Sequence, residues 1–92
     1  MKINSILCCC MSGLGSSFLV EMNVKKVLAQ LGMNQVTVNH AGVYDAAPGA
    51  ADLFICGVDI KEECEKYGPT LALNSLTDYH ELEEKFKALI GA

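Results

Sequence analysis

Short apolar runs alternate with amphipathic stretches along this chain. Apolar side chains dominate residues 3–9 and 53–56, and continuous runs of about four to eight such residues are typical of strands buried in a parallel sheet. Residues 36–40 alternate between apolar and polar, and residues 70–73 are again mostly apolar, which favours two further strands. The pattern therefore predicts four strands.

A helix is predicted between the first two strands. Ser16 or Ser17 can cap its start by accepting a hydrogen bond from a first-turn N–H, and Gly32 supplies a stop at its end. Glu21 precedes Lys25 by four residues, which predicts a favourable ion pair on the solvated side of the helix. The apolar positions recur at helical spacing along the other face: Val20, Val24, Val27, Leu28 and Leu31.

The second half of the chain carries a weaker helical signal until its end. Residues 45–51 are rich in turn formers and predict a loop, whereas residues 59–67 are charged and weakly helical. Asp78 can cap a final helix, whose apolar face contains Leu82, Phe86, Leu89 and Ile90. Because strands alternate with helical stretches, we expect one α/β domain over residues 1–92, with a four-stranded parallel sheet and helices on both faces.

The composition limits the class of function. A chain of 92 residues holds one domain with a modest core. Its net charge of -4 argues against nucleic acid as a partner, because nucleic-acid binding needs a basic surface. The apolar runs are too short to span a bilayer, and no signal-peptide pattern is visible, so we expect a cytoplasmic protein.

The five cysteines do not have the arrangement of a disulfide scaffold or a zinc site. Cys8, Cys9 and Cys10 are adjacent, so successive side chains point to opposite faces of a strand. The odd number of cysteines favours reduced thiols. Cys-x-x-Cys pairs are missing from the sequence, and His40 and His80 have no partner at ligand spacing, so we expect no metal. Ordinary core packing accounts for four of the thiols, Cys8, Cys9, Cys56 and Cys64.

Cys10 differs from the other cysteines because it stands where a strand leads into a loop and a helix. Gly13 and Gly15 in this loop permit positive φ and close approach of the backbone to an anion. The helix start adds a positive dipole end, which favours a thiolate or a bound phosphate. We therefore predict that Cys10 is a nucleophile, followed by a phosphate-binding loop of Met11, Ser12, Gly13, Leu14, Gly15, Ser16 and Ser17.

Several known phosphate and redox motifs do not fit this loop. Phe18 occupies the third small position of a dinucleotide-binding fingerprint, and the Gly-Lys-Ser/Thr of a Walker loop is missing, so no nucleotide cofactor is expected. Thioredoxin-like chemistry would need Cys-x-x-Cys. A cysteine phosphatase grips the phosphoryl group with an arginine, whereas all seven basic residues here are lysines. The loop is better suited to holding a phosphoryl group and passing it on.

The loop resembles that of the IIB component of the bacterial phosphoenolpyruvate-dependent sugar phosphotransferase system. The likeness is to its lactose, ascorbate and galactitol group, and particularly to ascorbate-type members, which carry Cys-Gly-x-Gly-x-Gly-Ser-Ser after the first strand. The matching residues are Cys10, Gly13, Gly15, Ser16 and Ser17. Only Cys10 lies three residues before Gly13, and Met11 stands where the family usually has glycine.

This resemblance implies a cysteine that is transiently phosphorylated. The phosphoryl group would come from a phosphohistidine on a IIA partner and go to a sugar held by a membrane IIC transporter. A small phosphatase-like hydrolase and a non-catalytic regulatory adaptor are the alternatives. The ascorbate-type loop favours L-ascorbate or a related acidic sugar or polyol as the substrate.

Other polar residues are given no catalytic role. His40 and His80 are expected to be ordinary surface or edge histidines. Tyr44, Asp45 and Asp59 follow strand ends and are able to border the same cleft, but we do not predict that they take part in catalysis. The Glu-rich segments 61–66 and 81–87 are interpreted as solvated helix faces.

Overall fold

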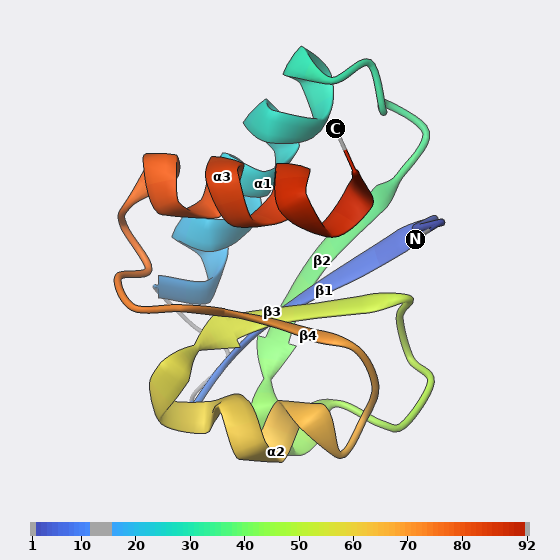
Figure 1. The fold of residues 1–92 in the computed structure, drawn as a ribbon. Helices are drawn as coiled ribbons and strands as arrows, with labels where there is room; N and C mark the ends of the chain where they lie inside the picture. The colour runs from blue at the N-terminus through green and yellow to red at the C-terminus, as the bar shows by residue number, and fades with distance from the viewer. Residues whose placement is uncertain (1, 12–15, 92) are drawn as a thin grey trace.

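The structure is a computed structural model that describes residues 2–11 and 16–91, without the side chains of residues 16 and 17. Four strands alternate with helices along the chain (Figure 1). The strands are β1 (Ser5–Cys10), β2 (Thr37–Gly42), β3 (Leu53–Gly57) and β4 (Thr70–Leu73). The helices are α1 (Ser16–Gln30), α2 (Lys61–Glu65) and α3 (Tyr79–Ile90), with short 3-10 turns η1 (Val43–Asp45) and η2 (Val58–Ile60).

The four strands form one parallel sheet in the order β2-β1-β3-β4. This arrangement places β1 and β3 in the centre, where their runs of apolar residues are buried from both sides. The two edge strands are β2, in which only Val38 and Gly42 are buried, and β4. The predicted parallel α/β fold is confirmed.

Helices cover both faces of the sheet, as the sequence predicts. In Figure 1, α1 and α3 lie on one face and α2 lies on the other. The larger core lies beneath α1 and α3 and includes Val20, Val24, Leu82 and Phe86. The smaller core lies beneath α2 and contains Cys9, Val43, Phe54, Cys56, Ile60 and Cys64.

The element boundaries agree with the pattern to within about two residues, and β1 and β2 are both shifted toward the C-terminus by one or two residues. Residues 3 and 4 precede β1, and the strand continues through Cys10; β2 likewise runs on to Gly42. Gly32, two residues after the end of α1, has φ 72, a conformation that favours glycine. Asp78 caps α3 as predicted, since its Oδ1 accepts a hydrogen bond from the Glu81 N–H at 3.1 Å. Over the described parts of the chain, no helix is long and apolar enough to cross a membrane.

Candidate functional site

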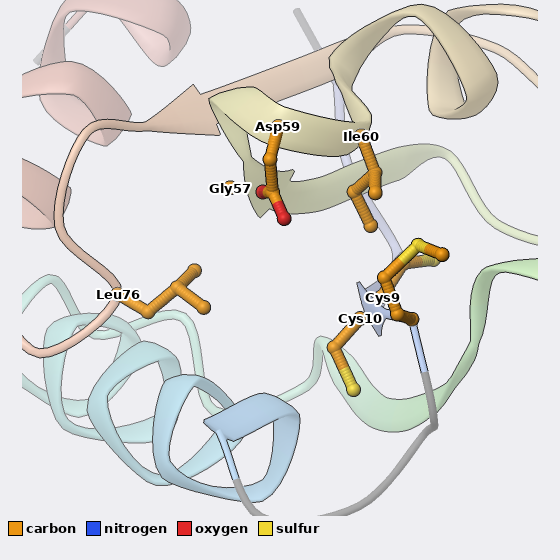
Figure 2. Close-up of a pocket in the computed structure, with 7 residues that line it drawn as sticks. Cys9, Cys10, Gly57, Asp59, Ile60 and Leu76 are labelled. Atoms are coloured by element: carbon orange, nitrogen blue, oxygen red, sulfur yellow. The ribbon is translucent and has the colours of Figure 1, made fainter.

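The carboxyl ends of β1 and β3 lie side by side at the point where the chain connections from these two strands lead in opposite directions across the sheet. From β1 the chain passes through α1 to β2 on one side, whereas β3 pairs with the other side of β1 and continues through α2 to β4. A crevice opens at such a point because the two connecting helices lie on opposite faces of the sheet. A pocket of about 230 Å³ lies here (Figure 2). Its lining residues are Cys9, Cys10, Met11, Gly57, Asp59, Ile60 and Leu76.

Cys10 is the last residue of β1 and lines this pocket. Cys8 pairs with Ile55, so continuation of the same register places Cys10 beside Gly57 at the end of β3. Figure 2 shows the Cys10 sulfur pointing toward the side of the pocket on which α1 begins. Backbone N–H groups at the start of a helix favour negative charge, so this position suits a thiolate or a thiophosphate.

The other residues predicted to bind phosphate are described only in part. Met11 lines the pocket and is 54% exposed. Residues 12–15 lie outside the described residues, as do the side chains of Ser16 and Ser17. The predicted phosphate-binding role of residues 11–17 stays a prediction.

The two cysteines before Cys10 point to opposite faces of the sheet, as predicted. Cys8 belongs to the core beneath α1 and α3, where burial and the nearby charge of Glu21 raise its pKa to about 12. Cys9 belongs to the core beneath α2, where a hydrogen bond to Cys64 and burial raise its pKa far above the ordinary value. Both side chains are therefore neutral thiols near neutral pH, which fits their predicted role in core packing.

Asp59 is a residue of this site to which the sequence analysis gave no role. It lies in η2, directly after β3, and its side chain lines the same pocket as Cys10. In Figure 2 its carboxylate points into the space between Leu76 and Cys10. The sequence signal was a carboxylate two residues after a buried strand, but only the pairing of β3 with β1 brings it to Cys10.

The prediction that Glu21 lies on a solvated face of its helix is wrong. Its ion pair with Lys25 is present, with Nζ 3.0 Å from Oε2, but Glu21 is only 8% exposed. The other carboxylate oxygen lies 2.5 Å from Nδ1 of His40 on β2. Burial opposes the charge, but hydrogen bonds from His40 and Lys25 hold the pKa of Glu21 below its ordinary value. His40 is exposed on the edge strand β2, as expected, and it forms a partly buried polar contact with Glu21 of α1.

The remaining candidate residues lie away from the pocket. Tyr44 and Asp45 are exposed on η1 and do not line it. His80 is exposed on α3, as predicted, and its ring contacts that of Tyr79. Within residues 2–11 and 16–91, no group of three His, Cys, Asp or Glu side chains is arranged to hold a metal ion.

Comparison with known families agrees with this geometry. A family model described as PTS system, Lactose/Cellobiose specific IIB subunit matches residues 5–88. The chain belongs to this family. It is accordingly a phosphotransferase domain of a sugar phosphotransferase system, a class that carries the phosphoryl group on a cysteine. The lactose, ascorbate and galactitol group inferred from the loop is consistent with this match. A search of curated proteins found no match to this IIB domain.

Proposed function

We propose that Cys10 is the phosphorylated residue of this IIB domain. It accepts the phosphoryl group from a phosphohistidine on a IIA protein and passes it to a sugar bound by a membrane IIC transporter. The observation that supports this most strongly is the position of Cys10 at the switch point of the sheet, in a pocket and near the start of α1. Cys8 and Cys9 are poor alternatives because their raised pKa values keep them as thiols.

The chemistry follows from a thiolate in this position. The Cys10 sulfur attacks phosphorus, the S–P bond forms, and the N–P bond breaks with its electron pair going to the histidine nitrogen. We propose that the backbone N–H groups of residues 11–17 and the hydroxyls of Ser12, Ser16 and Ser17 bind the phosphoryl oxygens. Because the chain contains lysines but no arginine, no guanidinium assists hydrolysis, which favours transfer.

The surface around this pocket supports docking of a partner protein. Met11 and three residues in the first half of α1, Phe18, Leu19 and Met22, are large apolar side chains with 40–54% of their surface exposed. Exposed apolar side chains close together in the fold are typical of protein interfaces. We propose that the IIA protein and the cytoplasmic side of IIC bind here in turn, and that the protein works in the cytoplasm. For the sugar, we propose L-ascorbate or a related acidic sugar or polyol.

Phosphorylation of the purified chain tests this proposal. Incubation with phosphoenolpyruvate and the upstream phosphorylation proteins should add the mass of one phosphoryl group, and peptide mapping should place it on Cys10. Cys10→Ser should abolish the addition, whereas the matched variant Cys8→Ala should retain it. Phosphate on a different residue of Cys10→Ser would refute the proposal. Cys10-dependent turnover of an aryl phosphate, without transfer to a sugar, would favour a phosphatase instead.

A further inference from the structure

We propose that Asp59 is the general base of the second half-reaction, in which the phosphoryl group leaves Cys10 for an acceptor hydroxyl. This inference rests on the proposed role of Cys10. The two side chains line one pocket and come from neighbouring strand ends, Cys10 from β1 and Asp59 from the turn after β3. Among the described residues of that pocket, Asp59 alone carries a carboxylate, and the others are apolar, glycine or cysteine.

The carboxylate is placed by the residue two positions before it. A Cβ atom on Gly57 would lie 2.5 Å from Oδ1 of Asp59, which is closer than two such atoms approach. Gly57 has φ -78 and ψ 159, an extended conformation that any residue adopts, so its backbone does not require glycine. What the missing side chain provides is room for the Asp59 carboxylate beside the end of β3. The same hypothetical Cβ would lie 3.6 Å from Leu76, so Leu76 borders this space.

The two half-reactions differ in their need for a base. When phosphate arrives, the attacking atom is the Cys10 thiolate, and it has no proton to lose. When phosphate leaves, a hydroxyl oxygen attacks phosphorus, and four changes balance the step. The O–P bond forms, the S–P bond breaks, its electron pair returns to the Cys10 sulfur, and the hydroxyl proton goes to the Asp59 carboxylate. A positioned carboxylate typically contributes about 10²–10⁴-fold to such a proton transfer.

The surroundings of Asp59 are compatible with this role. Cys9 and Cys10 share the pocket with Asp59, and the charge of Asp59 also acts on the thiol of Cys56 on β3. Asp59 also lines an adjoining surface hollow, together with Glu62 and Glu63 of α2. No described cation lines either hollow, so Asp59 is not held in an ion pair there. Asp59 is exposed to solvent, and an acceptor can therefore reach it.

The test measures the two half-reactions separately. The chain is phosphorylated by the upstream proteins and purified, and loss of phosphate from Cys10 to water and to added glycerol is followed between pH 4 and pH 8. We expect Asp59→Asn to form the phosphoenzyme within a few-fold of the normal rate but to lose phosphate to glycerol at least about 10-fold more slowly. The rate of transfer to glycerol should have a different pH profile in Asp59→Asn than in the wild type.

Two further variants distinguish a base from a structural effect. Gly57→Ala keeps the carboxylate but displaces it, so it should slow transfer to glycerol as Asp59→Asn does. Asp45→Asn removes an equal charge from an exposed acid outside the pocket and should behave as the wild type. A normal transfer rate in Asp59→Asn, or an equal loss in Asp45→Asn, would overturn the inference. If Cys10 of the wild type is never phosphorylated, the proposed function is wrong. That result differs from a phosphorylated Cys10 whose transfer does not depend on Asp59.

Discussion

Oε1 of Glu21 lies 2.5 Å from Nδ1 of His40, and this contact joins the first half of α1 to the edge strand β2. Lys25 donates a hydrogen bond to the other oxygen at 3.0 Å. The edge of the Phe18 ring also packs against the ring of His40, with 5.7 Å between the centroids. These contacts fix the side of α1 that borders β2, and α1 begins close to Cys10.

Replacing Glu21 should destabilise the fold in a pH-dependent way. The folded pKa of Glu21 is lowered, so its ionic contacts contribute fully above the unfolded pKa of about 4.3 and are lost as the pH falls through the lower folded pKa. We expect Glu21→Gln to reduce the free energy of unfolding by about 1–2 kcal/mol at pH 7 and by less at pH 3. Urea denaturation at both pH values measures this difference, and an equal loss at both would contradict it.

Chemical modification should separate Cys10 from the other thiols. Cys8, Cys9, Cys56 and Cys64 are 0–2% exposed, whereas Cys10 is 7% exposed and lines a pocket. Under native conditions at pH 8, we expect iodoacetamide to modify Cys10 first. The other four should react slower by about two orders of magnitude, because the core must open before the reagent reaches them. Peptide mass mapping measures the order, and the same reaction in guanidinium chloride should modify all five.

Phe86 should be one of the most costly side chains to truncate. It is 1% exposed and packs α3 onto the sheet within the larger core. Phe86→Ala leaves a cavity that the neighbours fill only in part, so we expect a loss of about 3–5 kcal/mol in the free energy of unfolding. Tyr44→Ala is the matched aromatic control, because Tyr44 is 72% exposed and its removal should change stability by no more than about 0.5 kcal/mol.

The start of α3 should depend on the capping side chain of Asp78. Oδ1 of Asp78 accepts the Glu81 N–H, which otherwise has no partner within the helix. Asp78→Ala should lower the free energy of unfolding by about 1 kcal/mol, and Asp78→Asn should restore most of it, because an amide oxygen accepts the same bond. Glu84→Ala, at an exposed position of the same helix, should have little effect. Equal losses in Asp78→Ala and Asp78→Asn would show that the charge, not the hydrogen bond, matters.

The local sequence pattern predicted most of the elements because each rule depends on near neighbours. Continuous apolar runs gave β1 and β3, and helical spacing with an Asp78 cap gave α3. The loop register singled out Cys10 among three adjacent cysteines. The prediction that Glu21 is solvated was wrong. Its spacing from Lys25, four residues later, is the same as on an exposed helix face, so the sequence cannot distinguish the two cases. Glu21 is only 8% exposed because α1 packs against β2, where His40, nineteen residues away in the sequence, contacts its carboxylate.

The sequence by itself determined the elements, the parallel class of the sheet and the candidate nucleophile. The order of the strands was decided only by tertiary structure, because each strand's apolar pattern allows more than one neighbour. That order places β3 beside β1, and with it Asp59 and Gly57 in the pocket of Cys10. The sequence could place Asp59 only after the end of a strand, because its proximity to a cysteine forty-nine residues away depends on long-range pairing of the strands.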